Sequence, residues 1–272
     1  MGVQPFAYGR DDGPLAIAHR GGAGLAPENT LVAFGRSYAL GVRYLETDVR
    51  LTADGELIAF HDASLRRVTG RRRAVNRTDL AAIRELRVFG AEPIPTLSEV
   101  LLAFPDGRFS IDVKERAAIE PLAHLLIASG AANRVCVAGS WDSCLASVGE
   151  LAGVELTVAL GWRSLAATVS RLHMGRLPRT PYPAGTFAHV PLRLGKVAIF
   201  ADDLVDRARS IGVRLIVWTV DDPSTMHRLL DAGVDGIITD RPDVLREVLI
   251  ARGQWQPPES YDASLPVSDL AS

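Results

Sequence analysis

The stretch RYLETDV, residues 43–49, is a short apolar run that ends in acidic side chains. Its length and composition are typical of a strand buried in a parallel sheet. Such runs recur between residues 15 and 252, separated by amphipathic stretches with helical spacing. The eight runs are LAIAH (15–19), RYLETDV (43–49), FSIDVK (109–114), RVCVAG (134–139), ELTVAL (155–160), TFAHV (186–190), RLIVWTV (214–220) and GIITD (236–240). This eightfold alternation of strand and helix predicts an α/β fold, the TIM (β/α)8 barrel.

The chain has 272 residues, and we expect a single barrel domain over residues 1–252. After the second run, the Asp-Gly pair in LTADGELIAFHD (51–62) predicts a tight hairpin. Residues 63–96 hold a polar stretch with GRRR and the helix-like TDLAAIREL, which we interpret as a small insertion after the second strand. Residues 253–272 are rich in Pro, Ser and Asp, so we expect a loose tail.

Composition excludes several classes of function. Hydrophobic residues make up 47% of the chain and charged residues 23%, which is typical of a globular protein with a full core. The 30 Lys and Arg residues nearly balance the 32 Asp and Glu residues, and the net charge of -2 creates no overall field for nucleic acid or anionic lipid. We expect no nucleic-acid partner, and an anionic substrate must be bound by local groups.

The cellular setting is indicated by what the sequence lacks. The two cysteines, Cys136 and Cys144, are too few for a disulfide scaffold, which favours a reducing cytoplasm. The N-terminal sequence MGVQPFAYGRDDG has no secretory signal, and no apolar run approaches the roughly 18 residues of a membrane span. We therefore expect no stable membrane anchor. The oligomeric state is not indicated.

Polar side chains gather at the ends of the predicted strands, where the catalytic loops of a parallel barrel begin. The first strand ends in HRGG, whose glycines let the backbone come close to a ligand. Because side chains in a strand alternate with period two, Glu46 and Asp48 point to one face. The same alternation projects Asp112 and Lys114 together. The candidate residues are His19, Arg20, Glu46, Asp48, His61, Asp112 and Lys114.

The acidic candidates favour a metal site. Ligation by the oxygens of Glu46, Asp48 and Asp112 suits a hard divalent cation, Mg2+ or Ca2+. No cluster of Cys and His with zinc spacing is present, and no phosphate-binding glycine motif supports a nucleotide cofactor. Phosphate oxygens are the natural remaining ligands of such a cation.

The basic candidates suit cleavage of a phosphodiester. That reaction needs a base for the incoming hydroxyl and an acid for the leaving alkoxide, and His19 and His61 fit these roles near neutral pH. Arg20 and Lys114, together with the metal, would neutralise the charge that accumulates on the phosphoryl oxygens.

Six stretches resemble, in order, motifs of the glycerophosphodiester phosphodiesterase family: HRGGAGLAPENT, YLETDVRLTADG, IAFHD, IPTLSEV, SIDVK and VDGIITDRPD. The resemblance covers roughly residues 15–250. It implies a TIM barrel that cleaves small glycerophosphodiesters, the deacylated phospholipids, to an alcohol and glycerol 3-phosphate with the help of a metal. The residue roles that it implies are acid/base catalysis for His19 and His61, metal ligation for Glu46 and Asp48, and phosphate contacts for Arg20 and Lys114.

One position departs from the family pattern. The family usually has Glu where this chain has Asp112, so the third ligand is one methylene shorter, and a shifted cation, a water or Glu115 must complete the shell. Asn29 matches the family's Glu-Asn-Thr run, so we expect it to bind substrate, to ligate the metal or to support the residues that do. Trp218 matches a family aromatic near the glycerol pocket. The sequence leaves two roles for Asp240, which could cap the last helix or contact the substrate.

Two alternatives to this function remain. The same barrel could support phospholipase D-like cleavage of lysophospholipids, in which a substrate hydroxyl attacks phosphorus, or it could bind phosphate esters without cleaving them. The sequence leaves open the leaving alcohol, the choice between Mg2+ and Ca2+, and whether water attacks directly or a cyclic phosphate forms.

Overall fold

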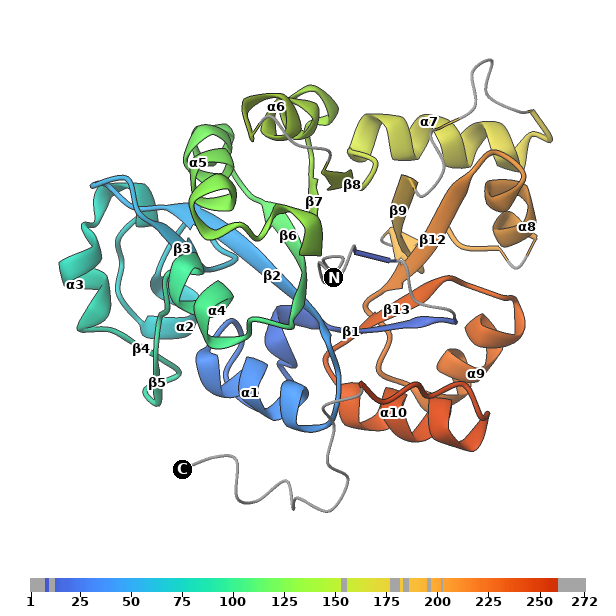
Figure 1. Ribbon diagram of the computed structural model, residues 1–272, viewed down its shortest axis with the longest axis horizontal. Helices are drawn as coiled ribbons and strands as arrows, with labels where there is room; N and C mark the ends of the chain where they lie inside the picture. Colours follow the sequence, from blue (N-terminus) through green and yellow to red (C-terminus); the bar gives the residue numbers. More distant parts are fainter. Residues whose placement is uncertain are drawn as a thin grey trace, which may run out of the picture.

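The computed structural model describes residues 8–9, 13–152, 156–176, 182, 186–194, 197–201 and 203–258. Eight parallel strands form a barrel with helices on its outside (Figure 1). The barrel strands are β1 (Leu15–Ala18), β2 (Tyr44–Leu51), β6 (Arg108–Val113), β7 (Val135–Gly139), β8 (Thr157–Val158), β9 (Thr186–Pro191), β12 (Val213–Trp218) and β13 (Gly236–Thr239). The predicted TIM barrel is confirmed. Glu155, the first residue of the fifth predicted strand, lies outside the described residues.

The barrel closes at one short seam. The strands follow the order β8-β7-β6-β2-β1-β13-β12-β9, and every neighbouring pair in this order is parallel. The two ends of the order meet in an isolated parallel bridge between Ala159 and Phe187. The amide of Leu160 donates to the carbonyl of Phe187 at 2.8 Å, which completes the ring.

One helix follows each strand of the barrel or, for β2, the excursion that comes after it. These helices are α1 (Leu31–Ala39), α4 (Leu97–Ala103), α5 (Ile119–Ser129), α6 (Asp142–Ala152), α7 (Trp162–His173), α8 (Leu204–Arg209), α9 (Pro223–Asp231) and α10 (Pro242–Ala251). Several begin at a residue that satisfies free backbone amides. Thr96 and Glu99 form a reciprocal capping box at α4, and Asp222 accepts from the amide of Thr225 at α9.

The inside of the barrel is a packed core. Apolar side chains from alternate strand positions meet there, among them Ile17, Phe187 and Ile216. Tyr8 also enters this core, and its ring lies edge-on to Tyr44 at 5.1 Å and to Phe187 at 5.4 Å. Each fully buried side chain of this kind contributes roughly 1.5–3 kcal/mol. This core lies below the carboxyl ends of the strands, where polar residues line the mouth of the barrel.

The predicted hairpin after β2 is present. Strand β3 (Leu57–Ala59) pairs antiparallel with β2, and Gly55 in the turn has φ of 88°, which glycine adopts without strain. The chain then forms α2 (Arg66–Thr69), α3 (Leu80–Arg84), β4 (Arg87–Val88) and β5 (Glu92–Pro93). These elements share an apolar cluster that includes Leu65 and Ile83, and they lie at one side of the barrel (Figure 1).

Several short elements complete the fold. They are the 3-10 turns η1 (His19–Gly21), η2 (Val75–Arg77), η3 (Arg116–Ala118) and η4 (Ala132–Arg134), and the antiparallel pair β10 (Arg193–Leu194) and β11 (Val197–Ala198). Of the predicted tail, residues 259–272 lie outside the described residues. In its described part, Trp255 packs against the core and lies 5.7 Å from the Arg246 guanidinium.

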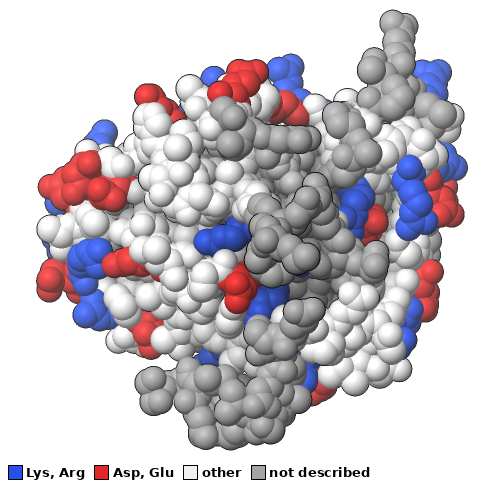
Figure 2. Space-filling model, in the orientation of Figure 1, with Lys and Arg blue, Asp and Glu red and all other residues white. Residues whose placement is uncertain are grey.

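Two features of the described residues bear on the partners of the protein: the length and apolarity of the helices, and the distribution of charged side chains on the surface. No helix within the described ranges has the length and apolarity to cross a bilayer. Basic and acidic side chains are interspersed over the visible face, which agrees with the net charge of -2 (Figure 2).

Candidate active site

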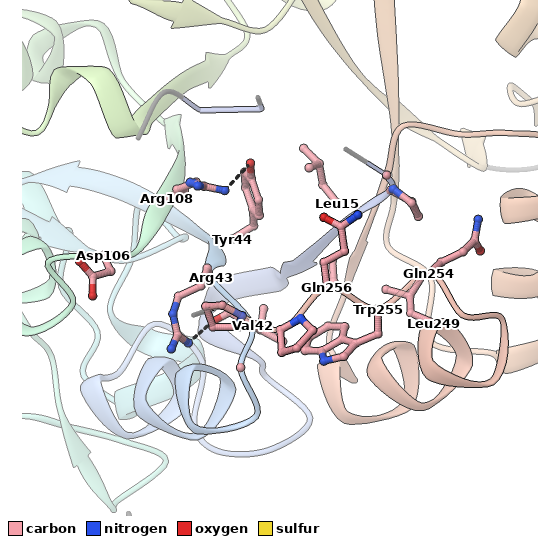
Figure 3. Close-up of a pocket in the computed structure, with 16 residues that line it drawn as sticks. Leu15, Val42, Arg43, Tyr44, Asp106, Arg108, Leu249, Gln254, Trp255 and Gln256 are labelled. Atoms are coloured by element: carbon pink, nitrogen blue, oxygen red, sulfur yellow. Dashed lines mark hydrogen bonds between the residues drawn. The ribbon is translucent and has the colours of Figure 1, made fainter. Parts of the chain in front are cut away.

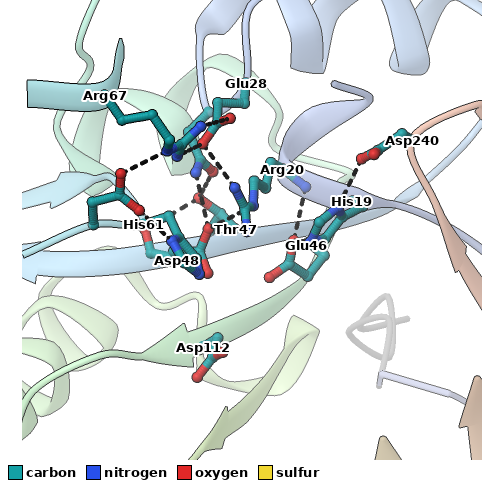
Figure 4. Close-up of polar contacts among 12 residues, drawn as sticks. His19, Arg20, Glu28, Glu46, Thr47, Asp48, His61, Arg67, Asp112 and Asp240 are labelled. Atoms are coloured by element: carbon teal, nitrogen blue, oxygen red, sulfur yellow. Dashed lines mark hydrogen bonds and ion pairs between the residues drawn. The ribbon is translucent and has the colours of Figure 1, made fainter. Parts of the chain in front are cut away.

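A pocket of about 400 Å3 opens where the barrel strands end. Most of the candidate residues from the sequence line it: His19, Arg20, Glu46, Asp48, His61, Asp112, Lys114 and Trp218. They come from five segments that are far apart in the chain and meet because parallel strands present the same ends to one mouth. Figure 4 shows most of these polar side chains converging.

Glu46 is a buried carboxylate on β2, and its residue is only 6% exposed. The backbone amide of Arg20 donates to Glu46 Oε2 at 2.7 Å. Arg20 has φ of 49°, a left-handed conformation that non-glycine residues adopt at a cost and that is often kept at functional sites. Burial raises the pKa of Glu46 to about 7, and repulsion from the Asp48 carboxylate adds to the rise.

Asp48 and Asp112 share one ammonium group. Lys114 Nζ lies 2.8 Å from Asp48 Oδ1 and 2.6 Å from Asp112 Oδ2. Burial opposes ionisation of Asp48, but Lys114 and Arg20 outweigh it and hold the pKa of Asp48 below its usual range. Burial likewise lowers the pKa of Lys114, and the two carboxylates reverse this and raise it. Lys114 and Arg20 therefore stabilise the ionised form of Asp48 in spite of its burial.

The donor chemistry of the pocket fits a hard divalent cation. Three carboxylates face one pocket, and the pKa of Glu46 is raised because burial and the charge of Asp48 outweigh the attraction of His19 and Lys114. In this structure the Lys114 ammonium lies between Asp48 and Asp112, and its positive charge balances that of the two carboxylates. Across the described ranges, no three or more His, Cys, Asp or Glu side chains are gathered closely enough to hold an ion.

His19 follows β1 directly and is held by an acidic partner. Its Nδ1 lies 2.7 Å from Asp240 Oδ1, and its Nε2 lies 4.0 Å from Glu46 Oε2 (Figure 4). Burial lowers the pKa of His19, but the hydrogen bond to Asp240 and the charge of Glu46 outweigh burial and raise it. The ring is thereby oriented with Nε2 toward the acidic part of the pocket.

His61, just after β3, has the same arrangement. Its Nδ1 lies 2.7 Å from Asp62 Oδ1, which leaves the other ring nitrogen for chemistry. A carboxylate at Nδ1 fixes the orientation of an imidazole and stabilises its protonated form. Three histidines line the pocket, and two of them, His19 and His61, have a carboxylate at Nδ1. Burial lowers the pKa of the third, His189, to about 4.

These two carboxylates were not assigned this role from the sequence. Asp240 was open between a helix cap and a substrate contact, but helix α10 has Arg241 at its cap position without a side-chain hydrogen bond. Asp240 contacts His19 because β13 and β1 are neighbours in the closed barrel. Asp62 follows His61 directly in the sequence, and that adjacency was the signal that could have identified it.

Two other residues lie outside the pocket wall. Asn29 was expected to bind substrate, to ligate the metal or to support the residues that do. It is 2% exposed and contacts β2: its Nδ2 donates to Asp48 at 3.0 Å, and its Oδ1 accepts from Thr47 at 2.8 Å. Glu115, the alternative third ligand, accepts from the amide of Leu51 at 2.9 Å. Asp112 lines the pocket and Glu115 does not.

The pocket also contains residues that the sequence did not indicate. Arg50 lines it, and its Nε donates to the carbonyl of His61 at 3.0 Å. The lining also has an apolar part, which includes Trp141 and Trp162. Trp162 and the predicted Trp218 meet edge to face, with ring centroids 6.3 Å apart.

A larger cavity, of about 570 Å3, lies at the opposite ends of the strands (Figure 3). Arg43, Tyr44 and Arg108 line one side, and Trp255 lines the other (Figure 3). Its described lining contains one carboxylate, Asp106, and no histidine. It therefore lacks the groups for acid/base catalysis, and the smaller pocket is the candidate active site.

Comparison with known proteins connects this pocket to a family. The model of the glycerophosphoryl diester phosphodiesterase family matches residues 19–244. The chain is similar to the probable glycerophosphodiester phosphodiesterase 2 of Mycobacterium tuberculosis, with 38% identity over 264 residues that cover 93% of this chain and 97% of the relative. It is also similar to a lysophospholipase D of Rattus norvegicus, with 25% identity over 268 residues that cover 86% and 85%.

Solved structures show the same fold. A phosphodiesterase of Oleispira antarctica, in complex with the product sn-glycerol-3-phosphate, superposes with a TM-score of 0.71. The match covers 88% of this chain and 97% of that one, at 22% sequence identity. At this level of identity the likeness supports the barrel fold.

Proposed function

The chain belongs to the glycerophosphoryl diester phosphodiesterase family and is a phosphodiesterase, and from this premise we propose a metal-dependent cleavage of glycerophosphodiesters to an alcohol and glycerol 3-phosphate. The observation that carries the proposal is one pocket with two carboxylate-backed imidazoles and three further carboxylates. Because the chain is an enzyme of this family, the alternative of a barrel that only binds phosphate esters is set aside.

In this proposal Glu46, Asp48 and Asp112 are the residues that hold the cation, Mg2+ or Ca2+. When bound, the cation supplies positive charge to the phosphoryl oxygens and to the carboxylates. Arg20 and Lys114 hold the phosphate and neutralise the charge that builds up on it. Trp218 contacts the organic part of the substrate, and Asn29 keeps Asp48 in place.

The two histidines move the protons. One imidazole takes a proton from the attacking water, whose oxygen forms the new bond to phosphorus. The other gives a proton to the alcohol oxygen as its bond to phosphorus breaks. Asp240 and Asp62 keep His19 and His61 oriented during both transfers. The result is one alcohol and one phosphate monoester, with no net change in protons on the enzyme pair.

The assay for this activity uses purified protein and a panel of diesters such as glycerophosphocholine and glycerophosphoethanolamine. We expect glycerol 3-phosphate to be released with Mg2+ or Ca2+, to stop after chelation with EDTA and to return when the metal is restored, because the carboxylates alone provide no positive charge. Comparing the two metals identifies the one used. No release from any diester with either metal contradicts the proposal.

A second candidate is phospholipase D-like cleavage of lysophospholipids. The apolar wall with Trp141 and Trp162 favours it, because such a wall accepts the apolar part of a substrate. The named lysophospholipase D among the relatives gives further support. Lysophosphatidylcholine tested beside glycerophosphocholine separates the two substrates. A cyclic phosphate product would identify attack by a substrate hydroxyl, and its absence would identify attack by water.

We also propose that residues 1–252 form one barrel domain, with residues 63–96 inserted into it, and that the protein works in the cytoplasm as a small-molecule enzyme. The family match over residues 19–244 supports the single domain. The presence of only two cysteines supports a reducing compartment.

A further inference from the structure

We propose that Arg67, on helix α2 of the insertion, is a positioning residue that fixes both His61 and Arg20 for the reaction. The inference rests on the proposed function, because it assigns Arg67 a role in the same site. Arg67 does not line the pocket, so its effect must pass through the residues that it holds.

All three nitrogens of the Arg67 guanidinium donate to two carboxylates (Figure 4). Its Nη1 and Nη2 donate to the two oxygens of Glu28 at 2.7 and 2.6 Å. Its Nε donates to Asp62 Oδ2 at 2.6 Å. A planar guanidinium matches a carboxylate in this two-pronged way, and an ammonium does not.

Each of these carboxylates has a second partner in the active site. Asp62 contacts His61 Nδ1 at 2.7 Å with its other oxygen. Glu28 Oε1 accepts from Arg20 Nη1 at 2.9 Å. Arg67 therefore joins the segment that carries His61 to the segment that carries Arg20, although its side chain is 44% exposed and it belongs to neither segment.

Charge balance explains why the link needs Arg67. Burial raises the pKa of Glu28, but Arg67 and Arg20 outweigh burial and hold the pKa below its usual range. Burial also acts against ionisation of Asp62, and Arg67 and His61 again reverse it. Without the guanidinium, Glu28 and Asp62 would each keep only one partner in the site, and the group that joins the two segments would be lost.

The test compares Arg67→Gln and Arg67→Lys with Arg66→Gln. Arg66 is the matched control, because it lies on the same short helix and its side chain makes no ion pair or hydrogen bond with the described residues. We expect Arg67→Gln to lower kcat about 10- to 100-fold, as loss of residues that orient catalytic ligands typically does, with a smaller rise in KM because Arg20 loses support. Arg67→Lys should recover part of the loss, and Arg66→Gln should match the wild type.

A double substitution tests the route of the effect. If Arg67 acts partly through Asp62, then adding Arg67→Gln to Asp62→Asn lowers kcat by less than Arg67→Gln does in the wild type. Full additivity of the two losses would contradict a shared route. A loss confined to KM would show direct substrate binding, and an unchanged kcat with a lower unfolding midpoint would show a purely structural role. Each of these outcomes overturns the proposal.

A readout without substrate keeps this test separate from the proposed function. The Nδ1 proton of His61, shared with Asp62, should give a downfield proton NMR signal in the wild type and in Arg66→Gln. The signal should weaken or disappear in Arg67→Gln. If the wild type cleaves no diester, the proposed function fails, and the NMR comparison still decides whether Arg67 positions His61.

Discussion

Replacing His19 with alanine should lower kcat by about 100- to 10,000-fold, the range that a positioned acid or base contributes. His19 is the histidine with the larger set of acidic neighbours, because Asp240 binds its Nδ1 and Glu46 faces its Nε2. These neighbours raise its pKa, which favours the protonated form at neutral pH. The expected role of His19 is therefore to protonate the leaving alcohol, with His61 as the base.

A change of leaving group tests that assignment. A glycerophosphodiester of nitrophenol needs no proton on its leaving oxygen, so His19→Ala should lose much less activity on it than on glycerophosphocholine. Equal losses on both substrates would assign the base role to His19. His124→Ala is the control, since His124 is exposed on α5 and does not line the pocket. Wild-type kcat in His19→Ala on natural diesters would exclude any catalytic role.

Replacing Glu46 with glutamine should abolish metal-dependent turnover and, in the metal-free protein, increase stability at neutral pH. Glutamine cannot supply the anionic oxygen that a divalent cation requires. The stability gain follows from the raised pKa: folding favours protonated Glu46, so its contribution is complete below pH 4.5 and is lost as the pH rises toward about 7. A shift of this size corresponds to about 3 kcal/mol at most.

The stability measurement needs unfolding curves of EDTA-treated protein at pH 5 and pH 8. The advantage of Glu46→Gln over wild type should be large at pH 8 and small at pH 5. Glu56→Gln, at an exposed position in the hairpin turn, is the control and should show no such difference. An advantage of the same size at both pH values would mean that buried charge is not its cause. Turnover by Glu46→Gln without added metal would contradict the ligand role.

The sequence was sufficient to predict the barrel because its strands are buried on both faces. Strands of this kind can be recognised as continuous apolar runs, such as LAIAH and RLIVWTV, without knowledge of their neighbours. The turn at Gly55 depends only on local conformation. The same logic located most of the pocket. Alternation along β2 put Glu46 and Asp48 on one face, and both line the pocket as expected.

The sequence could not show contacts that depend on which segments become neighbours. Asp240 and His19 are 221 positions apart and meet only because the last strand closes on the first. Arg67 resembled any other arginine in a basic insertion. Asn29 matched a motif, but its buried place behind Asp48 depends on how the loop after β1 folds back. Pairing across the barrel, rather than residue type, decides these roles.

Among the described residues, the barrel strands have their fewest hydrogen bonds at the bridge between Ala159 and Phe187. Strand β6 is paired with β2 along its whole length, whereas β8 is two residues long and the chain after it reaches β9 through that single bridge. Amide hydrogens near the bridge should exchange with solvent earliest, because so few bonds must break there. Glu46, Asp48 and Asp112 lie on β2 and β6, whereas Trp162 follows the short strand β8. Local opening at the bridge would therefore move the segment that carries Trp162 without breaking the strand pairing that holds the three carboxylates.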